Sequence, residues 1–190
     1  LRAMVIKKSL TPAAVVEVAL GVVDEHGPEG LTLAAVAQGC GVATPSLYKH
    51  VASLGELKAL VGVRVLEDMT DQFTAAVLGR GGDEAVTALM HAYRAYVAAH
   101  PKRYAAMPMD PLHDRVQEAA GTKLVGVMYA TLRGYGLEGP AAVHATRRLR
   151  VLVHGFASVE SAGGFGLPEE LDETYDQIVR MYLASLRNEP

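Results

Sequence analysis

The sequence predicts an all-α protein, and three observations support this fold class. Strand signals are scarce, because no sustained alternation of apolar and polar residues bounded by hairpin turns runs through the 190 residues. Helix-start signals recur, in which a capping residue precedes a proline, and each expected helix ends near glycine or proline. Half of the residues are hydrophobic and 21% are charged, which suits a globular chain, and we expect about nine helices.

The first expected helix begins at Thr11, a candidate N-cap that is followed by Pro12 at the first helical position. Gly27 and Pro28 end this helix. Apolar residues at three- and four-residue spacing form one stripe along it, namely Val15, Val18, Ala19 and Val22. Because Glu17 interrupts the apolar run, the segment predicts an amphipathic helix rather than a signal peptide.

Two short helices follow across a glycine-rich turn. Thr32 can cap a helix that runs through Gln38, and residues 39–41 form the turn. A second helix, marked by a proline, runs from Thr44 through about His50. This is the layout of a helix-turn-helix, whose second helix enters the major groove of DNA.

The remaining expected helices are also marked by caps, prolines and glycines. Ser53 and Glu56 form a capping box for a helix that reaches about Leu78, and residues 79–82 form a loop. Five helices are expected beyond this loop, near Asp83–Ala99, after Pro101, near Pro111–Tyr135, near Pro140–Ala162 and near Pro168–Arg187.

A helix-turn-helix needs a small residue where its helices cross and a residue that tolerates a positive φ at its turn. Ala37 and Gly41 supply these two residues. The spacing predicts a small core between the two helices, made of Val36, Cys40, Val42 and Leu47. Cys40 is then a packed apolar side chain, and a single cysteine excludes an internal disulfide, which fits a reducing cytoplasm.

The overall charge does not by itself predict nucleic-acid binding, because the net charge is −3 and the isoelectric point is about 6.2. In residues 1–60 the bases Arg2, Lys7, Lys8, Lys49 and Lys58 are matched by Glu17, Asp24, Glu25, Glu29 and Glu56. DNA binding must therefore come from local residues. The outer side of the second short helix is expected to carry Thr44, Pro45, Ser46, Tyr48, Lys49 and His50. The alternative is a solvated turn on the surface of a helical bundle.

Residues 11–57 resemble the N-terminal DNA-binding domain of the TetR family of transcriptional regulators. The resemblance lies in the opening amphipathic helix, in GPEGLTL at 27–33 and in AQGCGVATPSLYKHV at 37–51, and it covers about a quarter of the chain. It implies that Thr44, Ser46, Tyr48, Lys49 and His50 contact DNA. It also implies that Thr32, at the N-terminus of the first short helix, contacts a phosphate.

One position departs from the family pattern. The family usually has a phosphate-binding lysine at the start of its fourth helix, where this chain has Leu54. Lys58 lies one turn further on and is a candidate substitute. Because one positive contact is missing, we expect a modest salt dependence of DNA binding, with help from an N-terminal arm that carries Arg2, Lys7 and Lys8.

Residues from about 60 to 190 resemble, more loosely, the helical regulatory domain of the same family. The histidine, glycine and phenylalanine at 154–156 resemble a subgroup with a Trp-His-Gly signature, with Val153 at the tryptophan position. We therefore divide the chain into a helix-turn-helix DNA-binding domain at 1–55 and a helical ligand-binding and dimerisation domain at 56–190.

Methionines and tyrosines cluster in the middle helices of the second domain. The side chains expected to line an apolar cavity are Met90, Tyr93, Tyr96, Tyr104, Met107, Met109, Met128, Tyr129 and His154. The alternative is that these residues form ordinary core. The resemblance implies a small, mostly apolar effector. Its binding changes the spacing of the two DNA-binding domains of a dimer, residues 1–55 of each copy, which we call the heads.

The last two long helices are apolar enough to pair with a second copy of the chain across a two-fold axis. A dimer is expected because one helix-turn-helix contacts too few base pairs for useful specificity. The expected interface residues are Leu149, Leu152, Val153, Phe156, Val159, Ile178, Val179 and Tyr182, with Gly155 and Ala157 allowing close approach. The alternative places these residues in the core of a single chain.

No sequence motif for catalysis, a metal or a cofactor is found. No nucleophile–base set or phosphate-binding loop argues for an enzyme. The histidines of the second domain do not have the sequence spacing that is typical of zinc ligands. They are His91, His100, His113, His144 and His154. The charge run of Arg147, Arg148 and Arg150 is expected on a solvated face or an interface rim. No stretch reaches the roughly 18 uncharged apolar residues that a membrane span requires.

We expect a cytoplasmic, homodimeric transcriptional regulator that needs no cofactor and binds double-stranded palindromic operator DNA. Repressors and activators use the same head, and we expect a repressor that a small effector releases. The alternative is a helical small-molecule-binding protein whose DNA-binding head is degenerate, which Leu54 and the neutral head favour.

Overall fold

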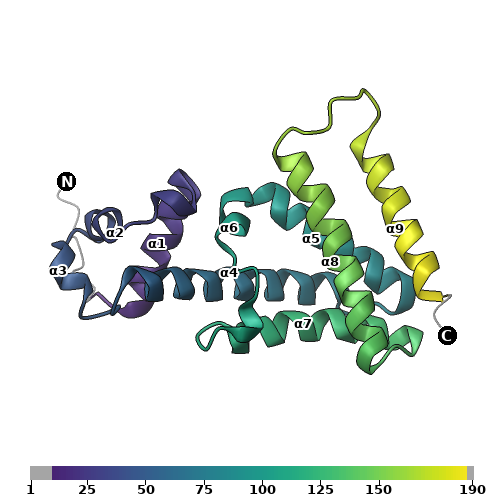
Figure 1. Ribbon diagram of the computed structural model, residues 1–190, viewed down its shortest axis with the longest axis horizontal. Coiled ribbons are helices and arrows are strands. Elements are labelled where there is room, and N and C mark those ends of the chain that lie inside the picture. Colours follow the sequence, from purple (N-terminus) through teal and green to yellow (C-terminus); the bar gives the residue numbers. More distant parts are fainter. Residues whose placement is uncertain (1–9, 188–190) are drawn as a thin grey trace, which may run out of the picture.

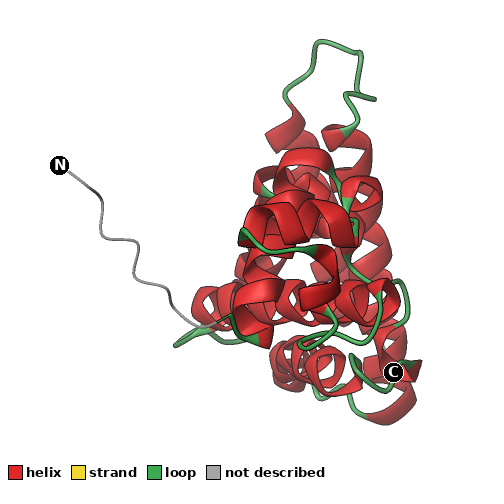
Figure 2. Cartoon of the chain, turned by 90° about the vertical axis from the view of Figure 1, so that its left-hand side faces the viewer, coloured by secondary structure: helices red, strands yellow, loops and turns green. Residues whose placement is uncertain are grey.

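The computed structural model describes residues 10–187, and this part of the chain is helical without any strand (Figures 1 and 2). The all-α expectation is confirmed, with nine α-helices over these residues. They are α1 Pro12–His26, α2 Leu33–Cys40, α3 Thr44–Leu47, α4 Leu54–Val77, α5 Gly82–Ala99, α6 Pro101–Ala106, α7 Glu118–Leu132, α8 Gly139–Ser161 and α9 Leu171–Arg187. None of these helices is both long and apolar enough to cross a bilayer. The expected arm residues Arg2, Lys7 and Lys8 lie outside the described residues.

The predicted caps set the ends of α1. The Thr11 hydroxyl accepts a hydrogen bond from the Ala14 amide at 3.2 Å, and Pro12 occupies the first turn, where its missing amide proton costs nothing. The helix ends at Gly27, whose φ of 75° favours glycine. One face of α1 is completely buried along the stripe Val15, Ala19 and Val23, and this stripe anchors α2, α4 and α6 around it.

Helix α4 lies along the long axis of the molecule (Figure 1). Helices α1–α3 lie at one end of α4, and the other helices pack along the remainder of its length. The expected boundary between residues 55 and 56 falls inside the first turn of α4. No linker separates the two parts at this point, because one continuous helix runs from the N-terminal helices into the C-terminal bundle.

The C-terminal bundle is assembled around α5, which packs against α4, α7, α8 and α9. Arg94 on α5 binds Glu160 of α8 at 2.8 Å and 2.5 Å and Asp172 of α9 at 2.8 Å. Its guanidinium also lies over the rings of Phe156 and Tyr175, at 5.0 Å and 4.8 Å from their centroids. Arg94 thereby holds three helices together, and both carboxylates raise the pKa of its guanidinium.

Two helical segments differ from the sequence expectation. The single helix expected at 111–135 is divided into a short 3₁₀ turn at Pro111–His113, α7 itself and a second 3₁₀ turn at Arg133–Tyr135. Asp114 is the reason for the first break, because its carboxylate accepts bonds from the amides of Val116 and Gln117 at 2.9 Å and 3.1 Å and so starts α7 anew. Pro111 then folds back onto Gly121, where an added β-carbon would lie only 3.0 Å away.

Smaller differences concern three helix ends. The first short helix of the pair extends to Cys40 rather than Gln38, and the second ends at Leu47 rather than at about His50. Beyond Leu47 the amides of residues 49 and 50 bond three residues back instead of four, so that the chain continues as a tight turn. The last helix begins at Leu171, three residues later than Pro168, after a fully exposed loop.

Candidate functional site

The turn between α2 and α3 is closed by backbone hydrogen bonds. Gly41 adopts φ 67° and ψ 30°, the left-handed conformation that the sequence predicted for it. Its amide donates to the Gln38 carbonyl, and the Val42 amide donates to the Ala37 carbonyl, both at 3.0 Å. Gly39 has a packing role that sequence reasoning missed, because a β-carbon there would lie 2.6 Å from Val18 of α1.

The small core between α2 and α3 forms where it was predicted. Val36, Ala37 and Leu47 are buried, while Cys40 and Val42 are half-buried against the same cluster. Burial raises the pKa of the Cys40 thiol above its usual 9.0. The thiol therefore stays protonated near neutral pH, and Cys40 acts as a packing residue.

The residues expected to contact DNA lie at the end of the molecule formed by α1–α3 (Figure 1). Pro45, Tyr48 and Lys49 are exposed, and the Tyr48 side chain is the most prominent large one, with 57% of its surface accessible. Thr44, Ser46 and His50 are half-buried on the same segment, whereas Leu47 and Val51 point into the core. The α3 segment thus has an apolar inner side and a polar outer side.

The flanking helix starts complete this surface. The Thr32 hydroxyl caps α2 by accepting from the Ala35 amide at 3.1 Å, and its side chain remains exposed. Ser53 caps α4 by accepting from the Glu56 amide at 3.0 Å, and the Glu56 carboxylate accepts from the amide of Ala52. Leu54 is half-buried against the core, whereas Lys58 is exposed one turn further along α4.

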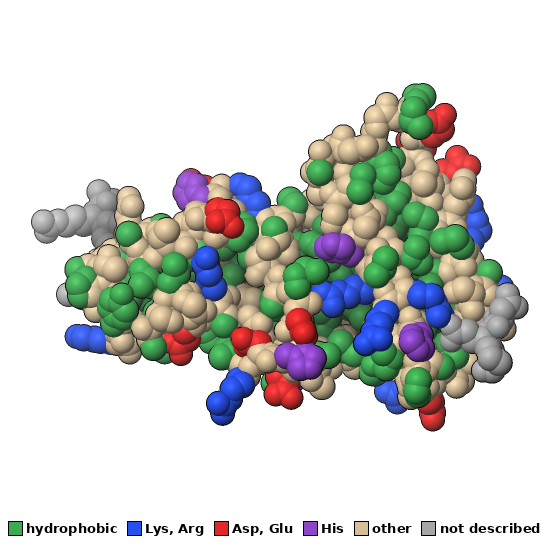
Figure 3. Space-filling view, viewed as in Figure 1, with side chains coloured by type: hydrophobic (Ala, Val, Ile, Leu, Met, Phe, Trp, Pro, Cys, Tyr) green, Lys and Arg blue, Asp and Glu red, His purple; other side chains and the backbone are tan. Residues whose placement is uncertain are grey.

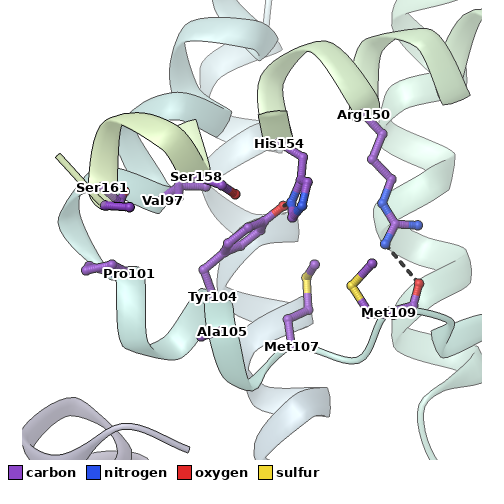
Figure 4. A pocket seen from close by; sticks show the side chains of 11 residues that line it. Val97, Pro101, Tyr104, Ala105, Met107, Met109, Arg150, His154, Ser158 and Ser161 are labelled. Atoms are coloured by element: carbon purple, nitrogen blue, oxygen red, sulfur yellow. Dashed lines mark hydrogen bonds between the residues drawn. The ribbon is translucent and has the colours of Figure 1, made fainter. Parts of the chain in front are cut away.

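A cavity of about 420 Å³ lies between α5, α6 and α8, and we call it the α6 cavity (Figure 4). Its walls are formed by Val97, Pro101, Tyr104, Ala105, Met107, Met109, Arg150, His154, Ser158, Ser161 and Ala162. A second cavity of about 400 Å³, which we call the α7 cavity, lies between α7, α8 and the 107–113 segment. The walls of both cavities include Met107, Met109 and Arg150, so that the two cavities are neighbours, and most of their lining side chains are apolar.

A chain of hydrogen bonds leads from the core into the α6 cavity. The Tyr93 hydroxyl lies 2.8 Å from the Tyr104 hydroxyl, which lies 2.7 Å from Nδ1 of His154. Burial raises the pKa of both tyrosines above the usual 10.0, and that of Tyr93 far above it. Both hydroxyls are therefore protonated near neutral pH and are available as hydrogen-bond donors.

The structure separates the residues expected to bind a ligand into three groups. Tyr104, Met107, Met109 and His154 line the α6 cavity, and Tyr93, Met107, Met109, Met128 and Tyr129 line the α7 cavity. The expectation needs correction for Met90 and Tyr96, which line neither of these cavities. They are 0% and 1% exposed because α5 turns them into the core, and burial raises the pKa of Tyr96 to about 12.

Arg150 is a cavity residue that sequence reasoning missed. It was expected on a solvated face or an interface rim, but it lines both cavities and donates to the Met109 carbonyl at 2.9 Å. Its position four residues before His154 was the available signal, because residues at this spacing share one face of a helix. Figure 4 shows that His154 reaches from α8 to Tyr104 and that Arg150 reaches from the same helix to Met109.

The short helix α6 connects the α6 cavity to α1. Arg103, the neighbour of Tyr104, binds both oxygens of Asp24 on α1 at 2.6 Å and Asp68 on α4 at 3.2 Å. The same Asp68 accepts from Arg64, which also binds Glu17 of α1 at 2.9 Å. The bond to Arg103 lowers the pKa of Asp24 below its usual 3.8.

The expected interface residues do not lie on one surface. The expectation needs correction for Leu149, Val153, Phe156, Val179 and Tyr182, which are buried inside the protomer and leave little surface for a partner. Leu152 and Ile178 are half-buried, and Val159 is 42% exposed. The prominent apolar side chains of α8 and α9 are instead Val151 and Met181, with 69% and 57% of their surface accessible. A hollow of about 470 Å³ lies beside them, and hydrophobic side chains gather over these helices in Figure 3.

Comparison with known proteins gives consistent matches. Residues 86–182 match the family described as "Tetracyclin repressor-like, C-terminal domain". The chain is 34% identical to the uncharacterized HTH-type transcriptional regulator YobS of Bacillus subtilis (strain 168), over 93% of both chains. It is 36% identical to the uncharacterized HTH-type transcriptional regulator Rv0681 of Mycobacterium tuberculosis (strain ATCC 25618 / H37Rv), over 81% of this chain and 72% of the relative.

The fold is also found in solved structures. The crystal structure of BioQ with its double-stranded DNA operator superimposes with a TM-score of 0.70. The match covers 95% of this chain and 99% of BioQ, at 19% sequence identity. At this identity the match concerns the fold, which is shared from the N-terminal helices to the last helix.

Proposed function

The chain belongs to the TetR family of transcriptional regulators, and from this premise we propose that it is a homodimeric repressor. It binds palindromic operator DNA through residues 1–55, and a small, mostly apolar effector bound within residues 56–190 releases it. The family consists of regulators rather than enzymes, and this chain is likewise a regulator. A repressor acts on the chromosome, and we therefore place its activity in the cytoplasm.

The two-sided α3 segment is the observation that carries the DNA-binding proposal. Leu47 is completely buried and fixes the segment against α2, while the exposed Tyr48 and Lys49 project outward. Hydroxyl and ammonium groups suit the phosphate oxygens and base edges of the major groove. Thr32 and Lys58, exposed on neighbouring helices, add phosphate contacts on either side.

The head has nearly equal numbers of acidic and basic residues, but this does not argue against DNA binding. Some of its carboxylates form ion pairs with arginines of the C-terminal helical domain. Glu17 and Asp24 both lie on α1, and they pair with Arg64 of α4 and Arg103 of α6. Two acidic groups are thereby compensated by arginines outside the head. BioQ, which has the same fold, was solved with its double-stranded DNA operator, and this supports operator binding by the present chain.

The exposed apolar face of α8 and α9 supports a homodimer. Val151 on α8 and Met181 on α9 flank the 470 Å³ hollow, and an isologous partner would cover both copies of this face at once. The half-buried Leu152 lines this hollow, and the half-buried Ile178 lies three residues before Met181 on α9, so that both remain candidate contacts. A dimer places two heads on half-sites about 34–36 Å apart, or a multiple of this distance.

The α6 helix supports release by an effector. Tyr104 lines the α6 cavity, and the adjacent Arg103 binds Asp24 on α1 and Asp68 on α4. An effector that displaces Tyr104 would therefore shift the ion pairs that hold α1. It acts only through the difference in its affinity for the two arrangements of the heads.

A gel-shift experiment tests DNA binding. The full-length chain is incubated with DNA from upstream of its own gene at two salt concentrations. We expect a retarded complex that weakens at the higher salt concentration, because phosphate contacts release counterions. Tyr48→Ala should abolish the complex without unfolding the protein, with the exposed Lys123→Ala on α7 as the matched control.

The same experiment separates the proposal from its competitor. Absence of a complex at both salt concentrations, from a folded and dimeric protein, would favour a small-molecule-binding protein with a degenerate head. Leu54 is the observation behind this competitor, since its half-buried side chain is used for packing and not for phosphate binding.

A further inference from the structure

We propose that the effector is an apolar molecule that carries a carboxylate, and that Arg150 and His154 bind this group between the two cavities. This inference rests on the proposed release by an effector and names the chemical class of that effector. It follows from the unused donors of Arg150, the direction of the hydrogen-bond chain and the charge of the cavity walls.

Arg150 presents a positive charge without a carboxylate partner. Its guanidinium donates one hydrogen bond, to the Met109 carbonyl at 2.9 Å. No carboxylate among residues 10–187 is recorded within 4.0 Å of it, in contrast to Arg64, Arg94 and Arg103, which each bind two. A guanidinium carries several further donors in a planar fork that matches a carboxylate. Because Arg150 is half-buried and lines both cavities, these donors face the ligand space.

The hydrogen-bond chain determines which nitrogen of His154 carries the proton. Tyr93 is completely buried, and the Tyr104 hydroxyl is its recorded partner. If Nδ1 of His154 donated to Tyr104, either the Tyr93 or the Tyr104 hydroxyl proton would be left without an acceptor in this chain of bonds, because the Tyr104 hydroxyl donates only once. An unpaired buried donor lowers the stability of the fold. The satisfied arrangement runs from Tyr93 to Tyr104 to Nδ1 of His154. Nδ1 is then an acceptor, and the neutral ring carries its proton on Nε2 as a donor.

The charge of the walls favours an anion. Among residues 10–187, no aspartate or glutamate lines the α6 cavity. The α7 cavity contains Asp110, but this residue is exposed and its carboxylate lies 2.8 Å from Nδ1 of His113. Arg147 adds a second positive charge to the α7 cavity. The polar groups that the two cavities offer around Arg150 are therefore mainly donors and cations.

The size and polarity of the space select a carboxylate with an apolar body. The cavities of about 420 Å³ and 400 Å³ share three wall residues, namely Arg150, the half-buried Met107 and Met109, which is 72% exposed. Methionine side chains adapt to apolar groups of different shape. A single planar carboxylate matches the guanidinium, and an alkyl or aryl body fills either cavity.

Calorimetric titration of the full-length protein tests this inference. The probes are octanoate, decanoate and 2-naphthoate, each compared with the primary alcohol of the same skeleton. We expect at least one acid to bind about tenfold or more tightly than its alcohol. Arg150→Met, which keeps the apolar stem, should weaken binding of that acid by about tenfold to a hundredfold. Arg115→Met is the matched control, because Arg115 is exposed and lines neither cavity.

The outcomes distinguish this inference from the proposed repressor function. Equal affinities for acid and alcohol, no binding by any probe, or equal effects of the two arginine variants would overturn the carboxylate site. If an acid binds in an Arg150-dependent manner but leaves the operator gel shift unchanged, the site stands and release by the effector is refuted.

Nitrogen NMR of ¹⁵N-histidine-labelled protein provides an independent test. At a pH where the ring is neutral, His154 should show an unprotonated Nδ1 and a protonated Nε2, and Tyr104→Phe should shift this balance. His154→Gln identifies the resonance. A ring that is protonated on Nδ1 in the unaltered protein would contradict the direction of the hydrogen-bond chain.

Discussion

The helix-turn-helix and the ligand cavities are built from contacts of very different sequence separation. The turn at Gly41 is closed by bonds to carbonyls three to five residues back. The α6 cavity depends on the bond between Tyr104 and His154, which are 50 residues apart, and its link to α1 depends on Arg103 and Asp24, which are 79 apart. Local contacts follow from the sequence pattern, whereas distant contacts depend on how the helices are packed.

The two regions also use polar groups differently. In the head the apolar side chains are buried in a small core, and the polar side chains face outward from it. In the cavities three side chains, Tyr93, Tyr104 and His154, are joined in a chain of hydrogen bonds, and Arg150 has no acidic partner within residues 10–187. Under the proposed function, the head binds DNA through its exposed polar side chains, whereas the cavities bind a ligand through a charge that no acidic residue compensates.

Leu47→Ala should have the largest effect of the variants, and this effect should arise in the helix-turn-helix head rather than at the ligand cavities. Leu47 is 0% exposed, and removing its side chain leaves a cavity in the small core of the head. We expect the free energy of unfolding of the head to fall by about 3 kcal/mol, with loss of operator binding. Urea denaturation measures the first effect and a gel shift the second. Unchanged stability would show that the head lacks a core of its own.

Tyr48→Ala is the matched control for this comparison. The side chain is 57% exposed, and its removal should change the free energy of unfolding by less than about 0.5 kcal/mol. Operator binding should nevertheless be lost, because the residue belongs to the proposed DNA surface. A large loss of stability would mean that Tyr48 is a packing residue.

Lys49→Ala should reduce operator affinity by about 1.5 kcal/mol and flatten its dependence on salt by about one unit. The exposed Lys49 ammonium would lose a single phosphate contact. Titrations at several salt concentrations give the slope, with Lys123→Ala as the control. Deletion of residues 1–8 should flatten the slope further, and an unchanged affinity would refute the arm hypothesis.

Arg103→Ala tests whether the ion pairs of Arg103 couple the ligand cavities to the head. The variant loses the ion pairs with Asp24 and Asp68, while the bond from the Lys102 ammonium of α6 to the Glu25 carbonyl of α1 remains. We expect the effector-induced change in operator affinity to fall by about 1 kcal/mol, while affinity without effector is retained. Operator titrations with and without effector measure the coupling. The exposed Arg133→Ala should leave it intact.

The smallest expected effect is a pH dependence of stability from Asp24. Its folded-state pKa is depressed by Arg103, so the pair stabilises the protein above the unfolded value of 3.8. This stability is lost as pH falls from 3.8 through the lower, folded-state pKa. Because 39% of the Asp24 side chain is exposed, we expect the pair to contribute less than about 1 kcal/mol to the free energy of unfolding. Unfolding curves of Asp24→Asn should lack this component, and an identical pH profile would contradict the assignment.

The sequence by itself determined the helices and the head. Thr11 caps α1, Ser53 caps α4, and Gly41 takes the left-handed turn, each as predicted. These features depend on hydrogen bonds between residues a few positions apart, and such bonds can be read from residue type and spacing. The break at Asp114 in the helix expected at 111–135 escaped prediction, because the side chain of an aspartate competes with the helix only in a particular turn.

Only the tertiary structure decided which face of each helix is used. The sequence pattern showed that α8 is amphipathic, but it could not tell that Leu149 is core, that Val151 is surface and that Arg150 faces the cavities. These roles depend on where α5, α6 and α7 pack against α8, and packing is set by many weak contacts between residues far apart in the chain. A local pattern specifies that a face is apolar, and its neighbour in space decides whether that face becomes core, cavity wall or exposed surface.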